Sequence, residues 1–203
     1  MTRVKRLFDL TASLAGSLLL LPLGAAIAVA VAADGGPVFF RQRRVGHQGR
    51  EFRIWKFRTM VPDADRVGPL LTAHGDPRIT RVGHWLRHAK LDELPQLLNV
   101  ITGEMSLVGP RPEVQRYVDR YRLEQRAVLE LVPGITDPAS LHYVDEASLL
   151  AAAEDPERLY IEQLMPDKIR RNLEYAADST PTTDIMVIAR TVLAAAGVGR
   201  KRS

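Results

Sequence analysis

The longest apolar stretch of the chain lies near its start, where no residue from Leu10 to Ala33 carries a charge. As a helix this stretch is roughly 36 Å long, and roughly 30 Å is enough to cross the hydrocarbon core of a bilayer. Pro22 stands in its middle and removes one helical hydrogen bond, so we expect a break in the helix there. The pattern predicts a membrane segment with a kink at Pro22.

Three interpretations of this stretch compete. A basic start, a leucine-rich centre and the small residues Ala28-Val29-Ala30 are typical of a cleaved signal peptide. A single spanning helix has the same length, but it usually concentrates Lys and Arg on one side. Here Lys5 and Arg6 precede the stretch, where we expect them to anchor it at the membrane surface, and several arginines from Arg41 onward follow it. Positive charge on both flanks favours a re-entrant helix with both ends in the cytoplasm.

Short aromatic and β-branched segments follow. The segments 38–40 and 52–57 read as the strands of a small β-hairpin, with Gly46 and Gly49 in the loop between them. Val82, Trp85, Leu86 and Ala89 recur at helical spacing. A second helix follows with Pro95 in its first turn and Gly103 at its end.

The rest of the chain shows mainly helical periodicity. Residues from Val114 to Tyr121 predict an amphipathic helix that ends before Pro133-Gly134, and further helical pieces cover 146–164 and 167–177. Thr180-Pro181 opens a last apolar helix that ends near Ala196. We therefore predict an α+β, mostly helical protein with a small β-hairpin, amphipathic helices and an N-terminal membrane segment.

Asp92 and Glu93 are two adjacent carboxylates at the start of the Pro95 helix. Acidic residues at a helix N-terminus often do no more than cap it. The alternative is a nucleophile or metal ligand beside a general base, at a place that also attracts phosphate. The sequence alone leaves both interpretations open.

Basic residues outnumber acidic ones by 28 to 24 in a chain of 203 residues, which mildly favours anionic partners. Four of them are candidates for a phosphate clamp rather than a solvated surface: Lys56, Arg58, Arg87 and Arg111. The prolines on both sides of Arg111 fix its backbone. The chain has no cysteine, which excludes disulfides and thiolate chemistry, and it has no glycine-rich nucleotide loop.

Several motifs in fixed order resemble those of one family, the bacterial sugar transferases, which are small monotopic polyprenyl-phosphate phosphoglycosyl transferases. The resemblance covers about residues 3–140. It rests on Lys5-Arg6-Leu7-Phe8-Asp9, the segment 36–46, Lys56-Phe57-Arg58-Thr59-Met60, Asp76-Pro77-Arg78-Ile79-Thr80, Leu91-Asp92-Glu93-Leu94-Pro95-Gln96-Leu97, the segment 105–112 and Pro133-Gly134-Ile135-Thr136.

The resemblance implies a transfer of sugar-1-phosphate from a UDP-sugar to polyprenyl phosphate, such as undecaprenyl phosphate, with release of UMP. This step initiates lipid-linked glycan or exopolysaccharide assembly. The resemblance assigns the role of nucleophile to Asp92, which would form a covalent phosphosugar intermediate. It assigns to Glu93 the role of assisting the acceptor. It also implies Mg²⁺ at the dyad, with Asp92 as a ligand, and substrate phosphates bound by Lys56, Arg58, Arg87 and Arg111.

The resemblance further implies a monotopic membrane protein. Its parts would be a re-entrant helix–break–helix over residues 1–35 and a membrane-associated cytoplasmic catalytic domain over 36–203, with interfacial amphipathic helices. The implied setting is the cytoplasmic face of the bacterial inner membrane, with the phospholipid bilayer as a partner, no nucleic acid, and a possible homodimer. The sequence departs from the family at the helix break, where Leu21-Pro22 replaces the usual Ser-Pro. The segment 137–142 also differs from that of many members, so the sugar is left unnamed.

Two other functions remain open at this stage. One is a non-catalytic membrane protein that binds anionic lipid or nucleic acid through its basic residues. The other is a magnesium-dependent diphosphate hydrolase, which would consume UDP-sugar without needing a lipid acceptor.

Overall fold

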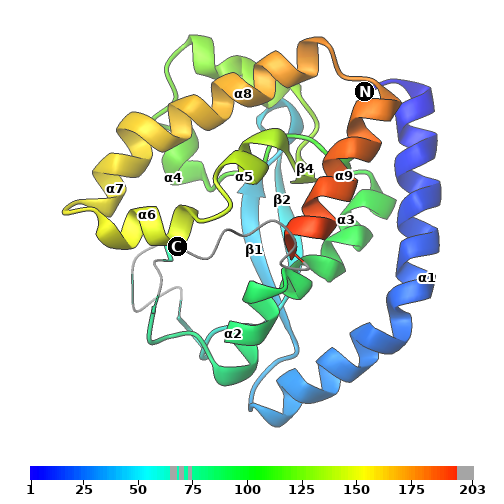
Figure 1. Ribbon diagram of the computed structural model, residues 1–203, viewed down its shortest axis with the longest axis vertical. Helices are drawn as coiled ribbons and strands as arrows, with labels where there is room; N and C mark the ends of the chain where they lie inside the picture. The colour runs from blue at the N-terminus through cyan, green and yellow to red at the C-terminus, as the bar shows by residue number, and fades with distance from the viewer. Residues whose placement is uncertain (65–67, 69–70, 73–74, 196–203) are drawn as a thin grey trace.

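The N-terminal apolar stretch forms one long helix, α1 (Arg3–Ala33), in the computed structural model of the chain. The structure describes residues 1–64, 68, 71–72 and 75–195, so the basic C-terminal tail lies outside the described residues. Figure 1 shows α1 as two straight pieces joined at a bend. Pro22 is the proline inside this helix, and we attribute the bend to it.

The two ends of α1 are packed, whereas its middle is bare. Its buried residues are Asp9 and Ser13 near the start and Ile27 and Val31 near the end. Leu18, Leu19 and Leu21 between them are 75%, 79% and 65% exposed. Among the described residues α1 is the one helix long and apolar enough to cross a membrane, and only 11% of its most apolar stretch is buried. A core helix of a soluble protein would show the opposite.

The predicted hairpin is present. Strands β1 (Phe39–Val45) and β2 (Glu51–Phe57) pair antiparallel, and a short 3₁₀ turn, η1 (His47–Gly49), connects them. Aromatic rings gather near the open end, where Phe39 stacks on Phe57. One face of the hairpin carries Arg41 over the ring of Trp55.

The helices around the dyad begin and end close to the predicted residues. Helix α2 (Arg81–His88) is capped by Thr80, whose hydroxyl accepts from the Gly83 N–H. A 3₁₀ helix, η2 (Leu91–Gln96), runs directly into α3 (Leu97–Thr102), and Gly103 ends α3 in the left-handed conformation with φ of 88°. Asp92 and Glu93 therefore lie in the first turn of η2.

A second small sheet was not predicted. Strands β3 (Ser106–Val108) and β4 (Gly134–Thr136) pair in parallel. Their backbones nearly touch just beyond the pairing: a Cβ atom on Gly134 would lie 2.1 Å from the Gly109 nitrogen. Glycine is required for this approach, which fixes the loop that carries Arg111.

The predicted long helix from Val114 to beyond Tyr121 is wrong. The structure has a single turn, α4 (Gln115–Val118), and then a separate 3₁₀ helix, η3 (Glu124–Glu130). The side chain of Gln125 accepts the Arg122 N–H at 2.8 Å. A side chain that takes over a backbone donor in this way competes with helix continuation.

The C-terminal part is helical, as predicted. It contains α5 (Pro138–His142), α6 (Glu146–Ala152), α7 (Pro156–Leu159), a π-helical turn η4 (Tyr160–Leu164), α8 (Met165–Ala177) and α9 (Pro181–Ala195). Figure 1 shows the hairpin at the centre, with α1 and α9 on one side and α6, α7 and α8 on the other. The largest buried cluster joins Val45 of β1 to Tyr117, Tyr160 and Met165. The many helices and the small sheets confirm the α+β, mostly helical class.

Candidate active site

The dyad is held where η2 packs against β2. Lys90 has φ of 54° and turns the chain from α2 into η2. Asn99 fixes how α3 lies along β2. Its Oδ1 accepts from Trp55 N at 3.0 Å and its Nδ2 donates to Arg53 O at 2.9 Å. This clamp brings Lys56, the next residue of β2, to the two carboxylates. Asn99 lies two residues after the motif 91–97, and no feature of the sequence marks it as a clamp.

Glu93 is an ion-paired carboxylate. Its Oε1 lies 2.6 Å from Lys56 Nζ and 2.5 Å from Arg111 Nη2. Burial raises the pKa of Glu93, but the charges and hydrogen bonds of Arg111 and Lys56 outweigh burial and hold this pKa well below its usual range. Glu93 is therefore ionised at neutral pH.

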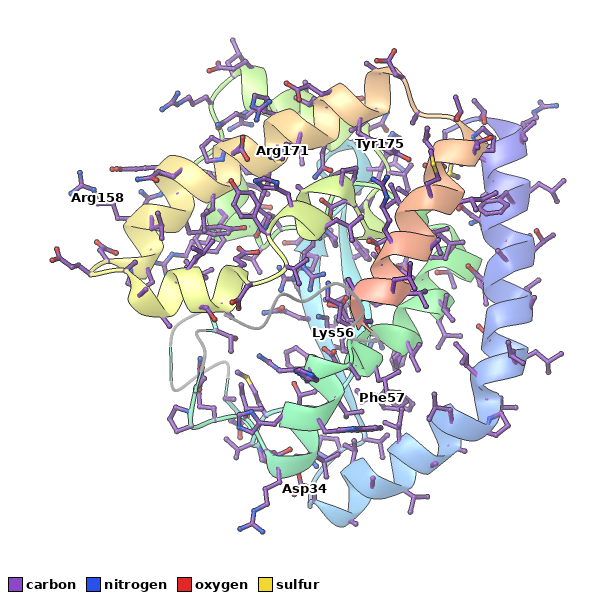
Figure 2. The ribbon with its side chains drawn as sticks, in the orientation of Figure 1. Asp34, Lys56, Phe57, Arg158, Arg171 and Tyr175 are labelled. Atoms are coloured by element: carbon purple, nitrogen blue, oxygen red, sulfur yellow. The ribbon has the colours of Figure 1, made fainter. Side chains whose placement is uncertain are left out.

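The two cations respond differently to the same carboxylate. The Glu93 charge raises the pKa of Arg111. Burial lowers the pKa of Lys56, although Glu93 opposes the change. Figure 2 shows Lys56 inside the molecule near the hairpin, whereas Arg158 extends away from its edge. Lys56 is thus a desolvated charge at the dyad, where its effect on a phosphate is greatest.

Asp92 differs from Glu93 in its hydrogen bonding and in the direction of its pKa shift. It is 7% exposed, and its nearest charged partner is Lys56, whose Nζ lies 3.7 Å from Oδ2. No residue of the described ranges donates a hydrogen bond to its carboxylate. Burial raises the pKa of Asp92, Lys56 and Arg87 oppose this, and the Glu93 charge adds to it. Its lone pairs are therefore open to a ligand, as the nucleophile interpretation of Asp92 requires.

Arg87 approaches the dyad from α2. Its Nε donates to Thr59 Oγ1 at 2.8 Å, and burial lowers its pKa while the Asp92 charge raises it. The structure thus brings together Asp92, Glu93, Lys56, Arg87 and Arg111, from four separate segments.

Arg58 lies elsewhere. It is 5% exposed, and its guanidinium donates to the carbonyls of Pro37, Met60 and Val31. Val31 O is one of the last carbonyls of α1, which need donors from outside the helix. Arg58 therefore holds the end of α1, and substrate binding by it stays a prediction that these contacts do not favour.

Lys5 and Arg6 likewise make contacts within the protein. Lys5 Nζ pairs with Asp184 of α9 at 2.6 Å, and Arg6 donates to Val100 O and Ile101 O at the end of α3. Beside them Asp9 is fully buried and accepts from Ser106 Oγ at 2.8 Å. Membrane anchoring by Lys5 and Arg6 remains a prediction. The role of Asp9 was missed because it resembles a flanking charge.

A metal ion at the dyad would have Asp92 and Glu93 as its candidate protein ligands. Among the described residues no group of three or more His, Cys, Asp or Glu side chains could hold an ion. Mg²⁺ is commonly bound through one or two carboxylates together with substrate phosphates. The free oxygens of Asp92 fit that donor set.

Comparison with known proteins agrees with the geometry. An undecaprenyl-phosphate glucose phosphotransferase of Komagataeibacter xylinus is 43% identical over 68% of this chain, which spans 27% of that protein. A UDP-N-acetylgalactosamine-undecaprenyl-phosphate N-acetylgalactosaminephosphotransferase of Aeromonas hydrophila is 34% identical over 93% of this chain and 43% of its own length. A UDP-glucose:undecaprenyl-phosphate glucose-1-phosphate transferase of Escherichia coli is 37% identical over 93% of this chain and 39% of its own length.

The chain therefore spans less than half the length of these relatives. The family model described as Bacterial sugar transferase matches residues 1–197, which is nearly the whole chain. With the dyad and its basic surroundings in place, the chain belongs to the bacterial sugar transferase family.

Proposed function

We propose that this protein transfers a sugar-1-phosphate from a UDP-sugar to a polyprenyl phosphate, undecaprenyl phosphate in bacteria, and releases UMP. The observation that carries the proposal is the contrast within the dyad: Glu93 is paired with two cations, whereas the buried Asp92 accepts no hydrogen bond from the residues that the structure describes. One nucleophile beside a cluster of cations suits two successive reactions of anionic substrates. The product starts the assembly of a lipid-linked glycan.

The first half-reaction consumes the donor. An Asp92 carboxylate oxygen attacks the β-phosphorus of the UDP-sugar, the bond from that phosphorus to the bridging oxygen breaks, and UMP leaves with the electron pair. Lys56, Arg87 and Arg111 offset the charge of the diphosphate. A magnesium ion held by Asp92 and the substrate phosphates would neutralise further charge on the leaving group.

The second half-reaction consumes the acceptor. A phosphate oxygen of the polyprenyl phosphate attacks the same phosphorus, the bond to Asp92 breaks, and the carboxylate is restored. Because the pKa of Glu93 is held low, Glu93 assists the acceptor as a carboxylate that orients Lys56 and Arg111 rather than as a proton donor.

The same proposal includes a monotopic arrangement at the cytoplasmic face of the inner membrane. Both ends of α1 are held by one body: Arg6 contacts α3 near the start, and Arg58 donates to Val31 O near the end. The exposed leucines lie between these contacts, at the bend. A helix fixed in this way at both ends enters and leaves the bilayer on one side, which favours the re-entrant interpretation over a spanning helix.

UMP release by the protein in nanodiscs tests the reaction. We expect a burst of UMP equal to the enzyme concentration without lipid acceptor, continuous release once undecaprenyl phosphate is added, and neither in Asp92→Asn. The best donor in a panel of UDP-sugars identifies the sugar. Continuous release without acceptor would instead indicate the hydrolase, and no release with any donor would favour a binding protein.

Thiol labelling tests the topology, since the chain has no cysteine of its own. Thr2→Cys and Asp34→Cys place single thiols at the two ends of α1. We expect an impermeant maleimide to label both in inside-out vesicles and neither in right-side-out vesicles, with the wild type as unlabelled control. Labelling of the two thiols from opposite sides would show a spanning helix.

A further inference from the structure

The loop over residues 109–113, which carries Arg111, is held at both of its ends. At its start it pairs with β4, where the Gly109 N–H donates to Thr136 O at 3.0 Å. At its end it pairs with β1, where the Val45 N–H donates to Glu113 O at 2.7 Å. The prolines on both sides of Arg111 restrict the backbone between these two points. The position of the Arg111 guanidinium at the dyad therefore depends on how firmly each end is held.

The second end of this loop is held by side chains as well as by backbone. The Tyr160 hydroxyl donates to Glu113 Oε1, and the Val114 N–H donates to Oε2 at 3.3 Å. Arg44 Nη1 donates to Pro112 O at 3.2 Å and lies 3.9 Å from Glu113 Oε2. The Glu113 side chain is only 13% exposed, and hydrogen bonds to a charged group are strong when water is largely excluded.

Tyr160 comes from a part of the chain far from the dyad motifs. It is the first residue of the π-helical turn η4, 47 positions after Glu113, and it is 3% exposed. Its ring packs on that of Tyr117, with the centroids 4.9 Å apart. Burial raises the pKa of the Tyr160 hydroxyl well above its ordinary value, so the hydroxyl keeps its proton and acts as a donor. π-Helical turns are frequent at functional sites.

The bond from Tyr160 to Glu113 is not needed to fill the core. Phenylalanine would occupy nearly the same volume as Tyr160, and an apolar residue at 113 would bury no charge. Replacing buried charged pairs with apolar residues often leaves stability unchanged or raises it. What the bond does provide is one fixed arrangement of a buried polar group, two residues after Arg111.

We propose that Tyr160 is a positioning residue for Arg111. Its hydroxyl holds the Glu113 carboxylate, which fixes the end of the loop. The fixed loop aims the Arg111 guanidinium at the diphosphate of the UDP-sugar. The C-terminal helices thereby take part in the reaction without touching the substrate. This inference rests on the proposed function, because it assigns a role within that reaction.

Tyr160→Phe tests the inference in a double-mutant cycle with Arg111→Lys. The measured quantity is kcat/KM for the UDP-sugar in UMP release, at equal concentrations of folded protein. With Arg111 present, we expect Tyr160→Phe to lower kcat/KM about tenfold, the effect of losing one hydrogen bond to a charged group. In Arg111→Lys the same change should lower kcat/KM by less than about twofold, because the guanidinium that the bond positions is gone.

Tyr175→Phe is the matched control. The Tyr175 hydroxyl also donates to a buried carboxylate, that of Asp184 at 2.7 Å, but this carboxylate lies on α9 and pairs with Lys5. Figure 2 shows Tyr175 near the end of α8, away from Lys56. We expect Tyr175→Phe to melt at a lower temperature and to leave kcat/KM unchanged, with or without Arg111→Lys.

Glu113→Gln repeats the cycle if Tyr160→Phe does not yield folded protein. The amide oxygen still accepts from the Tyr160 hydroxyl, but the bond loses its charge. Because charge-assisted hydrogen bonds are roughly twice as strong as neutral ones, we expect a smaller fall in kcat/KM, about threefold. This fall should again be absent in Arg111→Lys.

The outcomes separate the two proposals. Wild-type protein that releases no UMP with any donor overturns the proposed function, whatever Tyr160 does. UMP release with equal kcat/KM in the wild type and Tyr160→Phe overturns the role of Tyr160 alone. Equal falls with and without Arg111→Lys also overturn it, because Tyr160 would then serve the fold rather than Arg111.

Discussion

Two of the buried polar clusters are each built around an aspartate, Asp9 in one and Asp92 in the other. In the first, Asp9 accepts from Ser106 Oγ at 2.8 Å and from the Leu107 N–H at 3.4 Å, with Lys5 Nζ at 3.9 Å. In the second, the one ion-pair partner of Asp92 among the described residues is Lys56, with Nζ at 3.7 Å. Both carboxylates are more than nine-tenths buried, so the difference between them is one of hydrogen bonding, not of exposure.

The difference separates structure from chemistry. A buried carboxylate with its hydrogen bonds made stabilises one arrangement of the chain, here the docking of α1 on β3. A buried carboxylate without them keeps its lone pairs for a ligand at the expense of stability. The relation can be tested by variants that should affect activity and stability in opposite ways.

The largest effect is expected for Asp92→Asn. Loss of the nucleophile should lower UMP release by about 10⁶-fold, the order found when a covalent nucleophile is removed. The free energy of unfolding should stay the same or rise, since asparagine keeps the shape and removes a buried charge that few groups compensate. Denaturant titration in detergent measures the second quantity. A marked loss of stability would show that Asp92 holds the fold.

Asp9→Asn should give the opposite result. The neutral amide cannot replace a carboxylate that receives two donors and a nearby cation, so we expect the free energy of unfolding to fall by about 2–3 kcal/mol. The residual folded protein, counted by active-site titration of the UMP burst, should turn over at the wild-type rate. A variant that is stable but inactive would place Asp9 in the chemistry instead.

The two members of the dyad should affect the free energy of unfolding in opposite ways at low pH. The folded-state pKa of Glu93 lies below its unfolded value, so Glu93 stabilises the fold above about pH 4.3, its ordinary pKa. This stability is lost as the pH falls through the lowered value. Asp92 has a raised pKa, so it contributes the opposite slope: stability falls as the pH rises from its ordinary to its raised value.

Glu93→Gln should therefore flatten the loss of stability between pH 7 and pH 3, by about 2 kcal/mol. Asp92→Asn should steepen the same loss, because it removes the opposing slope. Denaturant titrations of both variants at the two pH values measure these changes. If Glu93→Gln loses as much stability between pH 7 and pH 3 as the wild type, the ion pairs of Glu93 with Lys56 and Arg111 would be contradicted.

The two clusters also differ in how far the sequence predicts them. The dyad was predicted because Asp92 and Glu93 are adjacent and Pro95 fixes a helix start, which are local signals. The hairpin was predicted from its alternating aromatic residues for the same reason. The Asp9 cluster depends on β3, whose three residues are too few to show a period, and on the close approach of Gly109 and Gly134.

Arg58 and Arg111 also show that contacts between distant segments cannot be predicted from local sequence patterns. Arg58 and Arg111 both stand in family motifs, and the sequence analysis assigned both to phosphate binding. The structure gives Arg58 to the last carbonyls of α1 and Arg111 to Glu93. Helix ends always require donors, but which side chain supplies them depends on contacts across 27 positions of the chain, which no local pattern contains.

The smallest effect is expected at Ser13, which tests whether unpaired polar atoms always mark chemistry. Ser13 is fully buried on α1, one turn after Asp9, and its Oγ has no hydrogen-bond partner in the described residues. The carboxylate one turn before it, Asp9, already accepts hydrogen bonds on both oxygens. Ser13→Ala should therefore raise the free energy of unfolding by about 1 kcal/mol, with UMP release unchanged. A loss of activity at unchanged stability would extend the functional region from the dyad to α1.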